Sequence, residues 1–87
     1  MSRPHRNPDY RLEAIDGELL LFHPERGEIM YCNETASLIW QLCDGGRTTQ
    51  EIVDLLVDTF PEAAAAIPGD VESTLQELHQ HGAIRFK

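Results

Sequence analysis

Residues 33–53, NETASLIWQLCDGGRTTQEIV, contain two helix starts separated by a glycine turn. Asn33 is a good N-cap residue, because its side chain can accept a hydrogen bond from the first turn of the helix that follows. Asp44-Gly45-Gly46 ends that helix, and Thr48 with Glu51 three residues later matches a capping box. This stretch therefore predicts two short helices joined by a tight turn.

Each predicted helix has a single apolar face. In the first helix the apolar residues recur at i, i+3, i+4 and i+7, and the second helix continues in the same manner. These residues are Ala36, Ile39, Trp40 and Cys43 in the first helix, and Ile52, Val53, Leu56 and Phe60 in the second. We therefore expect both faces, with Trp40, to be buried in a core.

Three β-strands are predicted before residue 33. Asp16-Gly17 favours a two-residue hairpin turn, and Pro24-Glu25-Arg26-Gly27 favours a second reversal. Alternating or short apolar segments surround these turns, at residues 10–14, 19–22 and 29–32. The pattern indicates a three-stranded antiparallel meander with one face to be covered.

A third helix is predicted after Pro61, which ends the second. Pro68 and Asp70 are typical of a helix start, and Gly82 is typical of the position just after a helix end. Residues 83–86 favour a short final strand. The sequence therefore predicts an α+β fold that is winged-helix-like, with a three-stranded antiparallel sheet followed by three helices.

The length of 87 residues predicts one domain. Residues 1–9 contain two prolines and three basic side chains without periodicity, so we expect a flexible N-terminal arm there and the folded domain in residues 10–87. No segment has the length and hydropathy of a signal sequence or a membrane span, so we expect a cytoplasmic protein.

The charge of the chain disfavours nucleic acid and anionic membranes as partners. The formal net charge is −8 and the pI is about 4.7, so a phosphate backbone would be repelled. A winged-helix DNA-binding regulator is the main alternative function, yet the third helix offers Glu72, Gln76, Glu77 and His79 and no Arg or Lys. A homodimeric structural subunit is a further alternative, because a free strand edge also supports self-association.

The sequence predicts no catalytic residues, no metal site and no cofactor. His79 and His81 are two positions apart on a helix, so their side chains diverge and cannot chelate one ion as an i, i+4 pair can. Cys32 and Cys43 have no adjacent cation that would lower a thiol pKa. We therefore expect a protein that is not an enzyme.

Several short motifs together resemble the PqqD-like family, whose members are recognition elements for ribosomally made, post-translationally modified precursor peptides. The resemblance covers residues 11–84. The motifs that carry it are Pro24-Glu25-Arg26, Asn33-Glu34-Thr35-Ala36, Cys43-Asp44-Gly45-Gly46-Arg47-Thr48, Glu51-Ile52, Asp70-Val71, and Leu75-Gln76-Glu77-Leu78 followed by Gly82.

This resemblance implies that the chain binds the leader of a precursor peptide and presents it to a separate modifying enzyme, such as a radical SAM maturase. In such domains the leader adds as a strand beside the third strand and lies in a cleft with the third helix. The implied peptide contacts are Glu28, Ile29, Met30, Tyr31 and Cys32 from the strand, and Val71, Leu75, Leu78 and His79 from the helix. The alternation of side chains does not decide which face of this strand lines the cleft.

Two features also match small stand-alone leader-binding proteins of lasso-peptide clusters. Gly27-Glu28 makes the second turn a regular hairpin, and Trp40 lies in the first helix. The resemblance therefore implies the binding role, and leaves open whether the pathway makes pyrroloquinoline quinone (PQQ), a lasso peptide or another modified peptide.

Overall fold

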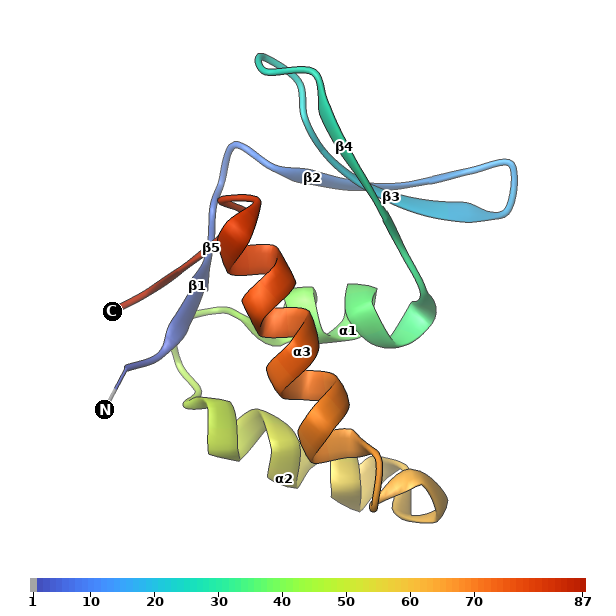
Figure 1. Ribbon diagram of the computed structural model, residues 1–87, viewed down its shortest axis with the longest axis vertical. Coiled ribbons are helices and arrows are strands. Elements are labelled where there is room, and N and C mark those ends of the chain that lie inside the picture. The colour runs from blue at the N-terminus through green and yellow to red at the C-terminus, as the bar shows by residue number, and fades with distance from the viewer. Residues whose placement is uncertain (1) are drawn as a thin grey trace.

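The computed structural model describes residues 2–87 and has the predicted α+β fold (Figure 1). A three-stranded antiparallel sheet is followed by three helices, and two further short strands lie near the chain ends. In chain order the elements are β1 (Pro4–Arg6), β2 (Arg11–Ile15), β3 (Glu18–His23), β4 (Glu28–Cys32), α1 (Glu34–Leu42), α2 (Thr49–Thr59), the 3-10 turn η1 (Pro61–Ala63), α3 (Ile67–Gln80) and β5 (Ile84–Phe86).

The main sheet has the order β2-β3-β4, so both β2 and β4 are edge strands. Asp16 and Gly17 form the first hairpin turn with positive φ values of 51° and 81°, as a type I′ turn requires. Leu21 in the central strand is paired with Leu12 of β2 and with Met30 of β4. This register directs these three side chains to the same face, where Leu21 and Met30 are buried.

The N-terminal segment differs from the predicted flexible arm, because residues 4–6 form a strand. β1 pairs antiparallel with β5, and Pro4 is fully buried. The backbone N–H of Arg6 donates to the Cys43 carbonyl at 2.8 Å, and that of Asn7 donates to the Ala83 carbonyl at 2.8 Å. These long-range hydrogen bonds satisfy backbone groups that would otherwise face water.

The helix starts predicted by the 33–53 stretch are confirmed. The Asn33 side chain accepts from the Ala36 backbone N–H at 2.7 Å. Thr48 accepts from the Glu51 N–H at 3.2 Å, and the Glu51 carboxylate accepts from the Thr48 N–H at 2.9 Å. The capping box lowers the pKa of Glu51, because the backbone N–H of Thr48 stabilises its ionised form.

Two details of the helices differ from the sequence prediction. α3 begins at Ile67, one residue before Pro68, so Pro68 and Asp70 both lie in its first turn and Ile67 is buried. Phe60 does not continue the buried face of α2, because the helix ends at Thr59 and the Phe60 side chain is 40% exposed. Pro61 explains this end, since a residue before proline is disfavoured in helical conformation.

The core lies between the inner face of the sheet and the helices. Trp40 is buried there as predicted, and the Arg6 guanidinium lies 5.6 Å from the centre of its ring. The buried apolar side chains are Tyr10, Leu21, Met30, Ile39, Trp40, Cys43, Ile52, Leu56, Ile67, Val71, Leu75, Leu78, Ala83 and Ile84.

The Thr48 capping box is expected to contribute to folding stability. Thr48→Ala removes the oxygen that accepts from the Glu51 N–H, so the free energy of unfolding should fall by about 1 kcal/mol. The melting temperature should fall by roughly 4–8 °C. Thr59→Ala is the matched control, because its hydroxyl bonds only to the Leu55 carbonyl in the last turn of the same helix. Equal losses in urea unfolding of the two variants would contradict the role of the box.

Candidate functional site

β4 combines a buried face, an exposed face and a free edge. Met30 is 8% exposed and faces the core, whereas Ile29 and Tyr31 on the opposite face are 59% and 71% exposed. Only β3 pairs with β4 within residues 2–87. Alternate N–H and C=O groups of β4 therefore point away from the sheet and can pair with another extended chain.

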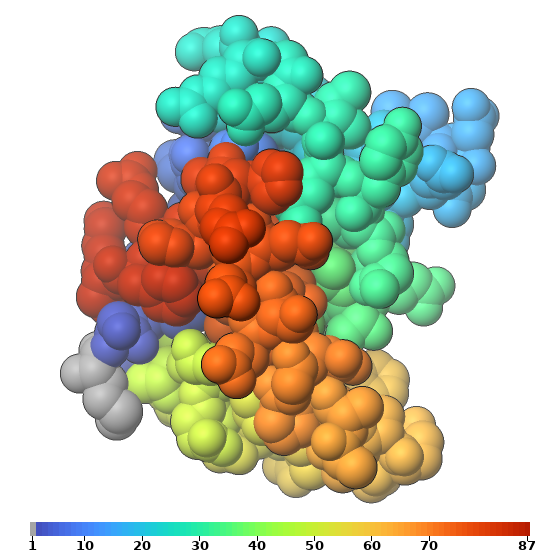
Figure 2. Space-filling view, viewed as in Figure 1, coloured from blue at the N-terminus to red at the C-terminus, as the bar shows by residue number. Residues whose placement is uncertain are grey.

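α3 runs alongside β4, and several contacts define the space between them. At one end, the Tyr10 hydroxyl lies 2.9 Å from a Glu28 carboxylate oxygen and 2.5 Å from the His81 carbonyl oxygen. At the other end, a cavity of about 180 Å³ is lined by Asn33, Thr35, Asp70, Ser73 and Thr74. Figure 2 shows β4 and the start of α1 beside α3 on the viewed face. We call the space from Tyr10 to Asp70 the β4–α3 cleft.

Two pKa shifts report the environment of the cleft. Burial raises the pKa of Tyr10, and the neighbouring Glu28 carboxylate raises it further. Burial also raises the pKa of the Cys32 thiol, and the negative charge of Glu77 adds to this shift. Both groups therefore stay protonated near neutral pH, and the cleft carries the negative charge of Glu28 and Glu77.

The predicted strand contacts fall on different faces of β4. Ile29 and Tyr31 lie on the outer face, and Glu28 marks the Tyr10 end of the cleft. Met30 is part of the core, and Cys32 is half-buried against it. Peptide contact by these residues stays a prediction, and the structure adds that Ile29 and Tyr31 are the two exposed apolar side chains beside the free edge.

The helix residues predicted to contact the peptide lie either in the core or on another side of α3. Val71, Leu75 and Leu78 belong to the core, and their side chains are 0–3% exposed. His79 lies on the side of α3 away from β4: its ring packs edge-on against Phe86 at 5.2 Å, and it lines a cavity with Thr49 of α2. The structure therefore places His79 beside Phe86 and α2, and peptide contact by the four predicted helix residues stays a prediction.

Other residues of α3 face the cleft instead. Asp70 and Thr74 line the cavity beside Asn33, and Glu77 lies near Cys32. Their spacing of i, i+4 and i+7 places them on one side of the helix. That spacing is visible in the sequence, but it does not tell which side of the helix meets β4.

Within the described residues, no group of three or more His, Cys, Asp or Glu side chains is placed to hold a metal ion. Cys43 is buried, and burial raises the pKa of its thiol to about 12, which opposes thiolate chemistry at neutral pH. None of the helices in residues 2–87 is long and apolar enough to cross a membrane.

Solved structures with the same fold hold leader peptides. TbiB1 in complex with the TbiA(beta) leader peptide has a TM-score of 0.72 and 22% identity, with 93% of this chain and 94% of that chain covered. Lasso peptide synthetase B1 complexed with the leader peptide has a TM-score of 0.75 and 19% identity, with 95% and 98% covered. At these identities the similarity establishes the fold.

Curated relatives are similar in sequence. The PqqA binding protein of Rhodopseudomonas palustris (strain BisB5) is 32% identical over 83 residues, which cover 93% of this chain and 79% of the relative. The PqqA binding protein of Rahnella aquatilis is 38% identical over 55 residues, 63% of this chain and 57% of that one. The family model of coenzyme PQQ synthesis protein D matches residues 18–84. The chain therefore belongs to the PqqD family.

Proposed function

We propose that the chain binds the leader of a ribosomally made precursor peptide as an added strand on β4 and presents it to a modifying enzyme. The observation that carries this proposal is the free edge of β4 beside the β4–α3 cleft. The names of the relatives and the leader peptides in the two similar structures support it. The chain itself acts without catalysis, in the cytoplasm where precursor peptides are synthesised.

Strand addition explains how one short strand can hold a peptide. The backbone of the peptide pairs with the free N–H and C=O groups of β4, and its side chains alternate between two faces. One set lies beside Ile29 and Tyr31 on the outer face of the sheet. The other set points into the cleft, toward Thr74 and Glu77.

The charge of these elements predicts a leader with basic residues. Residues 27–84 contain ten Asp and Glu residues and a single Arg or Lys, Arg47, which forms an ion pair with Asp44 at 2.9 Å. A surface of one sign attracts a partner of the opposite sign and speeds its association. The same charge disfavours the DNA-binding alternative.

Hydrogen exchange tests strand addition directly. The probe is a synthetic leader segment of the short peptide encoded beside this chain. We expect alternate amides of residues 28–32 to exchange quickly in the free protein and slowly in the complex, because the peptide pairs with them. The amides of β2, the other edge of the same sheet, are the internal control. Equal protection of β2 and β4, or protection of β4 by a second copy of the chain alone, would contradict the proposal.

Side-chain variants test the face of β4 that the peptide meets. Ile29→Thr and Tyr31→Thr keep a strand-favouring residue but remove apolar contact, so each should weaken leader binding about fivefold, or about 1 kcal/mol. Ile15→Thr is the matched control, because Ile15 is 50% exposed on the same face but lies on β2. Calorimetric titration would measure the three affinities. A comparable loss in Ile15→Thr would argue against binding at β4.

The two cysteines give an independent test of the complex. Iodoacetamide at pH 8 should modify half-buried Cys32 before Cys43, which is fully buried with a pKa of about 12. Bound leader should slow modification of Cys32, since it covers the adjacent edge. Mass spectrometry after timed quenching reads both sites, and Cys32→Ala identifies the faster one. Unchanged Cys32 labelling at saturating leader would place the peptide elsewhere.

A further inference from the structure

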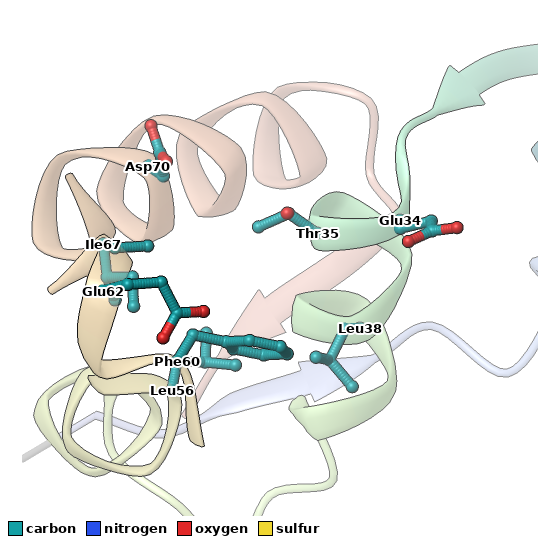
Figure 3. Close-up of a pocket in the computed structure, with 9 residues that line it drawn as sticks. Glu34, Thr35, Leu38, Leu56, Phe60, Glu62, Ile67 and Asp70 are labelled. Atoms are coloured by element: carbon teal, nitrogen blue, oxygen red, sulfur yellow. The ribbon is translucent and has the colours of Figure 1, made fainter. Parts of the chain in front are cut away.

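A second cavity lies beyond the end of the cleft, lined by residues of α1, α2, η1 and the start of α3 (Figure 3). Its volume is about 270 Å³, which is below the range of pockets for drug-sized ligands and suits a single side chain. The apolar residues that line it are Leu38, Leu56, Phe60, Ala63 and Ile67.

The cavity adjoins the β4–α3 cleft. Thr35 and Asp70 line both this cavity and the one beside Asn33. Asn33 directly follows β4. A peptide that pairs with β4 and continues past Asn33 therefore reaches the second cavity without crossing the core.

The rim of the cavity is acidic and has no basic counterpart. Glu62 and Asp70 line it, and neither forms a salt bridge within the described residues. Figure 3 shows the Glu62 carboxylate beside Phe60, whereas Glu34 points away from the cavity. No Arg or Lys lines the cavity. An uncompensated carboxylate next to an exposed apolar surface favours a ligand that is both apolar and cationic.

The exposure of Phe60 is consistent with such a ligand. Its side chain is 40% exposed although it lies between Leu56 and the η1 turn. A bulky apolar group placed against Phe60 would remove aromatic surface from water, and aromatic pairs gain stability beyond the area they bury.

We propose that this cavity is a second subsite of the same bound peptide, which takes one bulky apolar side chain next to a Lys or Arg. This inference rests on the proposed function and extends it from the strand to the flanking segment of the peptide. The apolar side chain lies against Phe60 and Ile67, and the basic side chain lies near Glu62 and Asp70.

Small probes test the cavity without strand addition. N-acetyl-Phe-Arg-amide should shift the amide signals of Phe60, Ala63 and Ile67 in an NMR titration of the labelled protein. N-acetyl-Phe-Glu-amide and N-acetyl-Gly-Arg-amide each lack one of the two features and should bind at least about fivefold more weakly. Equal binding of the three probes, or shifts confined to other regions, would overturn the subsite.

Charge variants test the basic neighbour. Glu62→Gln should weaken N-acetyl-Phe-Arg-amide roughly twofold to fivefold, the range of an exposed ion pair, and should leave N-acetyl-Phe-Glu-amide no weaker. Glu25→Gln removes an exposed carboxylate in the β3–β4 turn and is the matched control. A similar loss in both variants would assign the effect to net charge and overturn the role of Glu62.

A cavity-filling variant tests whether the leader reaches the subsite. Ala63→Phe fills the cavity from an exposed position in η1, and Ala63→Leu does so with less bulk if the first variant misfolds. Each should abolish dipeptide binding and lower leader affinity about fivefold. If the leader protects the β4 amides from hydrogen exchange but binds the filled variant as tightly as the wild type, the second subsite is overturned. If the leader leaves the β4 amides unprotected from hydrogen exchange, the proposed function is overturned instead.

Discussion

The pairing of Met30 with Leu21 is the constraint on which the candidate site depends. Both side chains are buried, and they are opposite each other in the β3–β4 register. Because side chains alternate along a strand, a shift by one residue would bury Ile29 and Tyr31 and expose Met30. The core therefore fixes which face of β4 looks outward, and the order β2-β3-β4 leaves its edge free.

A free edge next to exposed apolar side chains is a liability as well as a binding surface. Unpaired strand edges promote association of identical chains. The formal charge of −8 opposes this, since two copies repel each other. The same charge attracts a basic peptide, so one property of the sequence disfavours self-association and favours a leader.

The sequence predicted the local features of the fold and missed those that depend on distant residues. Asn33, Thr48 and Asp16-Gly17 act through hydrogen bonds or dihedral angles within a few residues, so their roles were predictable. The β1 strand was not, because its partner β5 lies at the other end of the chain. The apolar residues of segment 83–86 predicted β5, whereas Pro4-His5-Arg6 has no strand pattern of its own.

The sequence also does not tell which side of α3 lines the cleft. Leu78 is buried at the centre of the inner face of α3, and Glu77 and His79 lie on either side of it. Periodicity predicts the buried face but treats these two flanks as equivalent. Only the packing of α3 against α1, α2 and β5 places Glu77 near Cys32 and His79 near Phe86.

Strand addition supplies little selectivity, and side chains must supply the rest. Ordering each peptide residue costs about 1–2 kcal/mol of conformational entropy, and a backbone hydrogen bond contributes about 1 kcal/mol net. The net free energy of pairing with a strand of five residues is therefore close to zero. It also depends little on the peptide sequence. Affinity and specificity then depend on apolar area buried at about 25 cal/mol per Å². On β4 and at the second cavity, Ile29, Tyr31 and Phe60 are exposed and offer such area.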